Sequence, residues 1–402
     1  MAQLAELPAS AERDALELDL RATLGLTWMV LRGWAAPEVA QHLEPAWELS
    51  RSLDRDHHTL GILWGLWIYQ LCTGKVRTSL EWADVLLQQA ERTGRDDLYL
   101  AGHWAKTAAH FWLGEFELAI AHGDAILSRY ELERDRGVAD LTNWDPKTVA
   151  LVYKGMAEWM LGRPERGRQL AEQAVEHARL RGHLVDIGFS LFHAAFIYGF
   201  RRQAERFGAW QDELERSASE QGLLFYQYAA APVNRAWWLA VSGRYSEAYA
   251  KFPDAIQQWS SLGLLIGLPM YKSLAAECAL LCGEVAVAQR LIDECAEQMS
   301  RVGWEERAFE AEVLRIQGRI LLETGDTAQA ETALRAAVEA AQKQTCRSLE
   351  LRAIVGLARV LATQRRSGEV VSLLGSTYSA FTEGLDTPDL QEAKRALDEL
   401  AP

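Results

Sequence analysis

The chain has 402 residues, of which 49% are hydrophobic and 24% are charged, and its formal net charge is −14. These values are typical of a protein with ample apolar material for a core. The acidic excess argues against sequence-independent binding to nucleic acid, which needs clustered Lys and Arg. The five cysteines have no regular spacing, so they do not predict a disulfide framework. No apolar stretch is long enough to predict a membrane span. We expect a cytoplasmic protein that binds neither nucleic acid nor membranes.

The first half of the chain is patterned as helix pairs. Apolar residues recur at helical spacing over residues 12–32, Gly33 can end that helix, and a second helix is expected over 37–53. The next two pairs turn at Gly74 and Gly114. A glycine after the last helical residue can adopt the left-handed conformation that ends a helix. The pattern therefore predicts antiparallel helix hairpins.

The spacing widens in the middle of the chain. The fourth and fifth hairpins are expected to turn at Gly162 and near Gly199, but Gly114 and Gly162 are 48 residues apart. The excess falls in the charged, turn-rich segment 135–146, which we interpret as an inserted loop. Its residues Asn143-Trp144-Asp145 either fold over a groove as a lid or form only a long connection.

The clearest repeats occupy residues 235–345. Their turn glycines Gly243, Gly283 and Gly325 are 40 and 42 residues apart, and an alanine follows each one five positions later. Two more helices are expected after this stretch, and a final helix over 386–402 is expected to cap the array. Solenoids need a terminal element of this kind because each repeat packs only on its neighbours.

These features predict an all-α fold: a right-handed solenoid of about eight antiparallel helix hairpins in a single domain over residues 1–402. The motif Gly243-Arg-Tyr-Ser-Glu-Ala248 resembles the inter-helix turn of tetratricopeptide repeats. The period of about 40 exceeds the 34 residues of that family by roughly two helical turns.

Several stretches are similar to the C-terminal repeat arm of bacterial class III adenylate/guanylate cyclases fused to an AAA-type ATPase. The similar stretches are Pro37-Glu-Val, Leu63-Trp-Gly-Leu-Trp67, Asp145-Pro146, Arg315-Ile-Gln-Gly-Arg-Ile-Leu-Leu322 and Phe381-Thr-Glu-Gly-Leu-Asp-Thr-Pro-Asp-Leu390. In that family the repeats form a sensory or partner-binding arm behind catalytic modules. The same extended repeats form the inducer-binding arm of the maltotriose-responsive type of transcription activator.

The chain departs from the cyclase family at an important point. It contains no Gly-x-x-x-x-Gly-Lys-Ser/Thr phosphate loop and no cyclase domain. The resemblance therefore implies either an excised or free-standing arm, or a nucleotide cyclase or ATPase module that acts in cis or in trans.

Counting back from each turn glycine places residues on the first helix of each repeat. If tetratricopeptide geometry applies, the positions ten, six and three before that glycine face a concave groove, which is aromatic in the first five repeats and charged in the last two. The resulting candidates for contact with a ligand or partner are Trp64, Trp104, Phe111, Met156, Trp159, Phe189, His193, Phe196, Trp237, Arg315 and Arg319. An aromatic wall can stack on a heteroaromatic ligand or seat the apolar face of a partner. The alternative is that the long helices bury these side chains between repeats.

Two other groups of residues are interpreted as structural. The adjacent His57 and His58 are expected to point in different directions, and His103 and His110 lie about 10.5 Å apart along one helix, too far to share a metal ion. Three arginines that recur every seven residues predict a solvated outer face, with an acidic partner or a phosphate as the alternative: Arg352, Arg359 and Arg366.

No catalytic motif occurs in the chain. The leading hypothesis is a non-catalytic binding or regulatory module that recognises a protein or peptide segment in the aromatic groove, without a cofactor or a metal ion. A sensor arm for a small organic ligand is the second hypothesis. An unrecognised enzyme on a repeat scaffold is the third.

Overall fold

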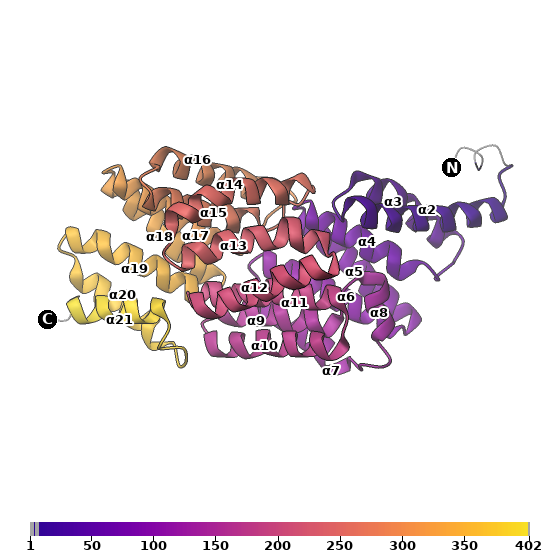
Figure 1. Cartoon of the computed structure of the whole chain (residues 1–402), viewed down its shortest axis with the longest axis horizontal. Coiled ribbons are helices and arrows are strands. Elements are labelled where there is room, and N and C mark those ends of the chain that lie inside the picture. Colours follow the sequence, from indigo (N-terminus) through magenta and orange to yellow (C-terminus); the bar gives the residue numbers. More distant parts are fainter. Residues whose placement is uncertain (1–3, 5–7, 401–402) are drawn as a thin grey trace.

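The computed structural model of the chain describes residues 4 and 8–400 and contains helices but no β-strand among them (Figure 1). The first helices of the successive hairpins are α2 (Ala11–Arg32), α4 (Thr59–Cys72), α6 (Asp96–Trp112), α9 (Pro146–Met160), α11 (Leu184–Phe200), α13 (Ala231–Val241), α15 (Leu268–Leu281), α17 (Glu310–Glu323) and α19 (Arg347–Thr363). Their partners are α3 (Pro37–Ser52), α5 (Val76–Thr93), α7 (Phe116–Arg129), α10 (Pro164–Arg181), α12 (Ala204–Gln221), α14 (Tyr245–Ser261), α16 (Val285–Ser300), α18 (Thr327–Lys343) and α20 (Ser367–Ser379). A π-helical turn, η1 (Tyr226–Ala230), precedes α13. The all-α solenoid is confirmed.

Glycine ends the first helix of most hairpins, as the sequence predicts. Gly243 and Gly283, for example, have φ values of 74° and 82°. The fifth hairpin differs, because Gly199 lies inside α11 and the chain turns at Arg202, with φ 54°. A Cβ atom on Gly199 would lie 2.5 Å from the Trp237 ring. Close helix packing, and not the turn, therefore requires this glycine.

The two atypical segments are also helical. Within the inserted segment 135–146, residues Arg136–Thr142 form the short helix α8. The final helix, α21, spans Pro388–Leu400 and begins at the proline that the sequence places in its first turn. Residues 401–402 of the expected cap lie outside the described residues.

The hairpins wind so tightly that one turn of the superhelix packs on the next. The backbone N–H of Leu265 donates to Cys72 O at 2.8 Å, and the N–H of Arg307 donates to Trp112 O at 2.8 Å. Both acceptors lie at the C-terminal ends of first helices, α4 and α6. The last carbonyls of an α-helix have no partner within the helix. The following turn of the superhelix supplies these partners.

The same arrangement continues along the solenoid. The Ser348 hydroxyl donates to Trp159 O at the end of α9, and the Arg352 guanidinium donates to Phe200 O at the end of α11, at 2.7 Å. These contacts join residues that are 189 and 152 positions apart in the chain. One continuous hydrophobic core, which runs from Leu18 to Leu349, accompanies them. Contacts between successive turns therefore stabilise the superhelix along its length.

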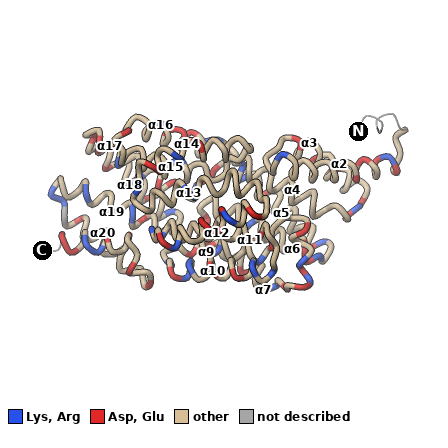
Figure 2. Tube along the Cα trace, viewed as in Figure 1, with Lys and Arg blue, Asp and Glu red and all other residues tan. Residues whose placement is uncertain are grey.

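Charged residues of both signs are spread along the whole chain. Figure 2 shows Lys and Arg interspersed with Asp and Glu along the helices, without a long uniformly basic stretch. None of the helices in the described part of the chain combines the length and the apolar character that crossing a bilayer requires.

We expect Gly167→Ala to destabilise the protein by about 1–3 kcal/mol, because a new methyl group would overpack the α9–α10 contact. A Cβ atom on Gly167 would lie 2.7 Å from the Gly155 carbonyl oxygen, which cannot move away as a side chain could. The control is Gly375→Ala in α20, where no atom lies within 4 Å of the new Cβ. This control variant is expected to be about 0.5–1 kcal/mol more stable than the parent chain, because alanine favours the helix more than glycine does. Urea unfolding followed by circular dichroism measures both variants, and equal midpoints would contradict the packing argument.

A buried carboxyl group lies at the junction between the turns of the superhelix. Glu306 is 2% exposed, and both of its carboxyl oxygens lie 3.2 Å from the backbone nitrogen of Gly267. Burial raises the pKa of Glu306 from 4.5 to about 8, although the hydrogen bond from Gly267 acts in the opposite direction. Between about pH 4.5 and pH 8, the folded state therefore keeps a proton that the unfolded state has lost.

The neutral Glu306 carboxyl group makes its full contribution to stability below about pH 4.5. This contribution is lost progressively as the pH rises to about 8, because over this range the folded state binds a proton that the unfolded state has released. Glu306→Gln removes this titration. We expect the difference in melting temperature between the variant and the parent chain to grow in favour of the variant as the pH rises from 5 to about 8. Thermal melts across this range measure the difference, and parallel pH profiles would show that Glu306 does not titrate in this way.

Candidate binding site

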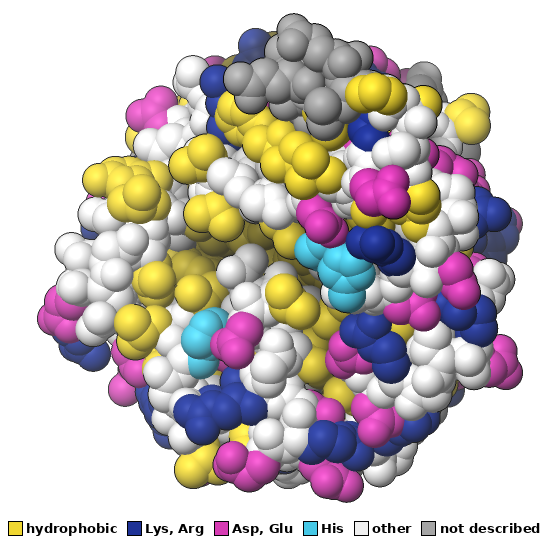
Figure 3. Space-filling model, turned by 90° about the vertical axis from the view of Figure 1, so that its right-hand side faces the viewer, with side chains coloured by type: hydrophobic (Ala, Val, Ile, Leu, Met, Phe, Trp, Pro, Cys, Tyr) yellow, Lys and Arg dark blue, Asp and Glu magenta, His cyan; other side chains and the backbone are white. Residues whose placement is uncertain are grey.

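The aromatic residues of the early repeats surround an apolar cavity of about 80 Å³. The aromatic cavity is lined by rings from several hairpins, some of them far apart in the sequence: Trp34, Trp67, Trp104, Trp112, Trp144, Tyr153, Phe189, Phe192, His193, Phe196, Phe225, Trp259 and Tyr271. The end of the molecule that carries α2 to α8 shows a central hollow with hydrophobic side chains along its walls (Figure 3).

The inserted segment contributes one of these rings. The Trp144 ring lies 4.9 Å from the Trp34 ring and 5.3 Å from the Phe189 ring, centroid to centroid. Its indole N–H donates to the Tyr226 hydroxyl at 3.0 Å, and the side chain is only 5% exposed. The insertion therefore places an aromatic side chain on the inner face of the solenoid.

Asp145 anchors the insertion directly after Trp144. Its buried carboxylate accepts hydrogen bonds from Arg181 at 2.7 Å, the Tyr130 hydroxyl at 2.7 Å and His177 Nε2 at 2.9 Å. Burial alone would raise the pKa of Asp145, but hydrogen bonds from His177 and Tyr130, together with the Arg181 charge, hold it below its usual 3.8. An ionised, fully bonded carboxylate fixes the backbone beside the Trp144 ring.

His193 brings a polar atom to the aromatic cavity. Its Nδ1 lies 3.0 Å from the Phe189 carbonyl oxygen, which can only accept, so Nδ1 carries the proton. Burial lowers the pKa of His193 to about 4, against the effect of this hydrogen bond. The ring is therefore neutral at pH 7, and its Nε2 is a hydrogen-bond acceptor.

Two indole groups next to the aromatic cavity lack a partner. The Nε1–H groups of Trp64 and Trp67 are buried, and no acceptor for them is found among the described residues. Leaving a buried donor without an acceptor costs about 1–3 kcal/mol. A ligand with a suitably placed acceptor would gain by satisfying such a donor.

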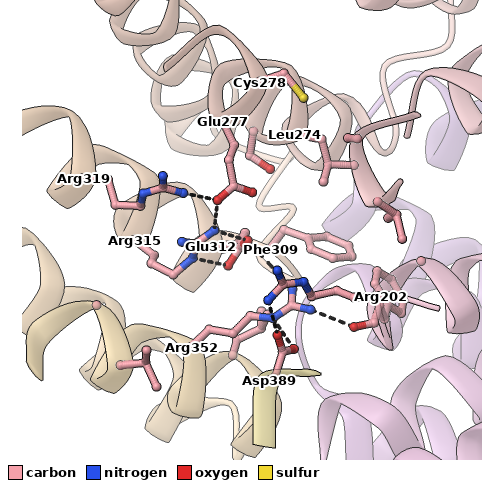
Figure 4. A pocket seen from close by; sticks show the side chains of 18 of the residues that line it. Arg202, Leu274, Glu277, Cys278, Phe309, Glu312, Arg315, Arg319, Arg352 and Asp389 are labelled. Atoms are coloured by element: carbon pink, nitrogen blue, oxygen red, sulfur yellow. Dashed lines mark hydrogen bonds and ion pairs between the residues drawn. The ribbon is translucent and has the colours of Figure 1, made fainter. Parts of the chain in front are cut away.

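A second cavity, of about 290 Å³, lies in the C-terminal half and has two contrasting walls (Figure 4). Its apolar wall consists of Phe200, Trp237, Met270, Leu274 and Phe309. Its charged wall consists of Arg202, Glu277, Glu312, Arg315, Arg319, Arg352, Arg359, Asp389 and Glu392. We call this space the charged cavity.

The helices α15 and α17 supply the centre of the charged wall. Arg315 donates to Glu312 at 2.7 Å and to Glu277 at 3.0 Å, and Arg319 also donates to Glu277. Burial alone would raise the pKa of Glu277, but the Arg315 and Arg319 guanidinium groups lower it to about 2. One carboxylate thus neutralises part of the charge of two arginines, and all three groups are ionised at pH 7.

One arginine of the basic stripe on α19, Arg352, turns toward this cavity, which corrects the expected outer face for that residue. Arg352 binds Asp389 at 2.8 Å, and the same carboxylate binds Arg202 at 3.2 Å. Arg359 also lines the charged cavity and donates to Glu392 at 2.7 Å. Contacts between α19 and α21 thus hold Arg352 inward, with its side chain 18% exposed, whereas the Arg359 side chain remains 64% exposed. Only Arg366, which does not line the charged cavity, binds outer glutamates on α18 and α20.

The eleven groove candidates fall into three sets. Trp104, Phe189, His193 and Phe196 line the aromatic cavity, whereas Trp237, Arg315 and Arg319 line the charged cavity. The remaining four are core residues that are at most 3% exposed: Trp64, Phe111, Met156 and Trp159. All eight aromatic or methionine candidates are buried; they are Trp64, Trp104, Phe111, Met156, Trp159, Phe189, Phe196 and Trp237. A role for any candidate in ligand contact stays a prediction.

Counting from the turn glycines did not identify lining residues outside the counted positions, although the insertion that carries Trp144 was expected either to fold over the groove or to form only a connection. Trp34 lies in the connection between α2 and α3, Trp144 lies in the insertion, and Trp259 lies in the second helix α14. None of the three occupies a position that recurs at the same distance from the turn glycine in other repeats. Asp389 comes from the capping helix, which the sequence identified only as the end of the array. The sequence shows that these residues are aromatic or charged, but it does not show that they line the two cavities.

The histidines also need a correction. His57 and His58 do not diverge, since the Nε2 atoms of both lie 3.0 Å from the same oxygen of Asp19. His103 contacts a histidine on the neighbouring helix, with 2.9 Å between its Nδ1 and that of His122. A turn and a helix pairing, which the sequence spacing does not show, produce both contacts.

The fold places the protein in the class of tetratricopeptide-like helical-repeat solenoids. No protein-family model matches the sequence, and no curated protein matches it either. Among solved structures, the chain is similar to a Rap protein complexed with competence and sporulation factor, at 12% identity and a TM-score of 0.53 over 85% of this chain and 97% of that one. It is also similar to NprR in complex with its cognate peptide NprX, at 8% identity and a TM-score of 0.51 over 85% and 98% of the two chains. At such identities the likeness shows the fold alone.

Proposed function

We propose that this protein is a non-catalytic binding module that holds a short peptide or a protein segment in the charged cavity. The observation that carries the proposal is the pairing of an apolar wall with a row of guanidinium groups across one space of about 290 Å³. Binding sites for organic ligands combine apolar surface with a few convergent polar groups. A peptide offers both an apolar side chain and a carboxylate.

Arg319 and Arg359 are the groups best placed to bind that carboxylate. A guanidinium has five N–H donors, and each of these two arginines donates to one carboxylate in the structure, Glu277 or Glu392. Their remaining donors match the geometry of a second carboxylate, which guanidinium groups bind in a bidentate manner. The ligand's adjacent side chain would pack against Trp237 and Leu274, which are apolar residues of the same lining.

Two further considerations support a peptide ligand. Both similar solved structures contain a bound partner, which for NprR is described as its cognate peptide. The resemblance to the cyclase–ATPase arms suggests a source for the segment, namely a nucleotide cyclase or ATPase module in cis or in trans, in the cytoplasm.

We expect the chain to prefer short peptides with a free C-terminal carboxylate over the same peptides with a C-terminal amide. A randomised library of short peptides, prepared in both forms and screened by fluorescence anisotropy, measures the preference. Arg319→Met should weaken binding of the selected peptides about 10- to 100-fold, because a hydrogen bond to a charged group contributes about 1.5–3 kcal/mol. Glu277→Gln should strengthen it, since the internal competitor for Arg319 loses its charge.

The matched control is Arg290→Met on α16, which removes a 67% exposed arginine side chain that is not part of the charged cavity. This variant should bind the selected peptides as the parent chain does. Equal affinity for the carboxylate and amide forms, or an unchanged Kd in folded Arg319→Met, would refute the assignment of the site.

The aromatic cavity favours a second candidate function, recognition of a small organic ligand. Its specific feature is the combination of apolar rings with a neutral imidazole acceptor on His193 and a buried indole donor without a partner on Trp67. A planar heteroaromatic group presents complementary donors and acceptors at its edge and stacks through its faces. The volume of about 80 Å³ limits the ligand to a small ring or to the ring-bearing end of a larger molecule.

For this second function, free nucleobases and indole derivatives are the probes. We expect at least one of them to raise the melting temperature of the parent chain, since a ligand that binds only the folded state stabilises it. His193→Phe keeps an aromatic ring but removes the acceptor, so the ligand should bind about 2- to 10-fold more weakly, as the loss of one hydrogen bond predicts. His103→Phe, outside the cavity lining, is the control. If no probe shifts the melting temperature, or if His193→Phe responds as the parent does, this function is ruled out.

A further inference from the structure

Three metal-ligating side chains converge at the N-terminal end of the solenoid, and none of them lines either cavity. His57 and His58 precede α4, and Asp19 lies on α2. Both histidine Nε2 atoms lie 3.0 Å from Asp19 Oδ1, and the three ligand atoms all lie within 4.8 Å of one another. Among the described residues, this is the one group of three His, Cys or carboxylate side chains with such spacing.

The turn that carries the histidines is fixed from both sides. The Ser50 hydroxyl donates to Arg55 O at 2.6 Å, which ties the turn to the end of α3. Arg92 binds the Asp56 carboxylate at 2.6 Å, and Arg95 donates to Asp56 O at 3.0 Å. Because these contacts hold the backbone on either side of Asp56, the two imidazoles are presented together before any ion is bound. A preorganised group loses little conformational freedom on binding.

The spacing of these atoms matches a small divalent cation. Zinc binds imidazole nitrogen and carboxylate oxygen at about 2.0–2.2 Å, so neighbouring ligands in a tetrahedral site lie about 3.3 Å apart. The observed distances of 3.0 Å between Asp19 and each histidine are close to this value, and the two Nε2 atoms, which lie within 4.8 Å of each other, approach it through rotation of the histidine side chains. The side chains are 29–50% exposed, so an ion can reach them from solvent.

We propose that Asp19, His57 and His58 form a binding site for a divalent first-row transition-metal ion of the zinc type. At 3.0 Å from the Asp19 carboxylate, which can only accept, each Nε2 carries a proton. On binding the ion, each imidazole shifts this proton through solvent to Nδ1 and ligates through Nε2, and the carboxylate supplies the third ligand. Two imidazoles and one carboxylate are a ligand set that first-row ions favour, and a fourth position remains for water. The ion links α2 of the first hairpin to the turn that begins the second hairpin.

The test uses the full chain after dialysis against EDTA, with Zn²⁺ as the probe in isothermal titration and Co²⁺ as the probe in visible absorption. The parent chain should bind one equivalent of Zn²⁺ at this site and should show the d–d absorption of Co²⁺ in a site of low coordination number. The double variant His57→Gln/His58→Gln should lose that equivalent and the absorption. Asp19→Asn should weaken binding by more than the roughly 10- to 100-fold that loss of an outer-shell partner causes.

Two matched controls exclude other ligands for the ion. His183→Gln removes a histidine whose side chain is 33% exposed and bound to Asp186, and Cys282→Ser removes the one cysteine that is not fully buried among the five. Both controls should bind Zn²⁺ and Co²⁺ as the parent does, and circular dichroism confirms that every variant is folded. A parent chain without the Co²⁺ absorption, or an unchanged Zn²⁺ stoichiometry and Kd in the double histidine variant, would overturn the proposal.

Discussion

The structure depends on the way in which helix-end carbonyls are bound across the turns of the superhelix. Every α-helix leaves its last carbonyls without a partner, and buried carbonyls must find one. In the first helices α4, α6, α9 and α11, these partners are backbone and side-chain donors of the following turn, as in Leu265 to Cys72. These hydrogen bonds hold neighbouring turns together. Both cavities are lined by residues from repeats that these contacts join.

The two cavities differ in the kind of side chain that their walls remove from water. The aromatic cavity gathers rings that gain from leaving water, and the insertion adds Trp144 to them through the fully bonded carboxylate of Asp145. The charged cavity instead carries arginines whose burial requires carboxylates, so Glu277 and Asp389 each serve two guanidinium groups. A ligand carboxylate would enter a network in which carboxylates already compete for the same donors.

The charged cavity also joins the last elements of the chain to the middle of the solenoid. Arg352 of α19 contacts both the end of α11 and Asp389 of α21. A ligand that alters these ion pairs would therefore act on contacts between one turn of the superhelix and the next. In a repeat protein, where each unit otherwise contacts only its neighbours, such contacts are the route by which distant repeats can influence one another.

The sequence by itself determined the local features: the helix pairs, the glycine turns such as Gly243, the period of about 40 and the start of α21 at Pro388. These follow from short-range rules of helix periodicity and capping. Counting from the turns also identified part of both cavity linings, including His193 and Arg319. Only the tertiary structure decided that the candidate rings are buried, that Arg352 faces inward and that His57 and His58 meet at Asp19. Arg352 contacts a distant repeat, and this outcome depends on a small rotation between repeats that accumulates over a superhelical turn. The contact of His57 and His58 with Asp19 depends instead on how the turn before α4 folds back on α2. No local sequence pattern encodes either arrangement.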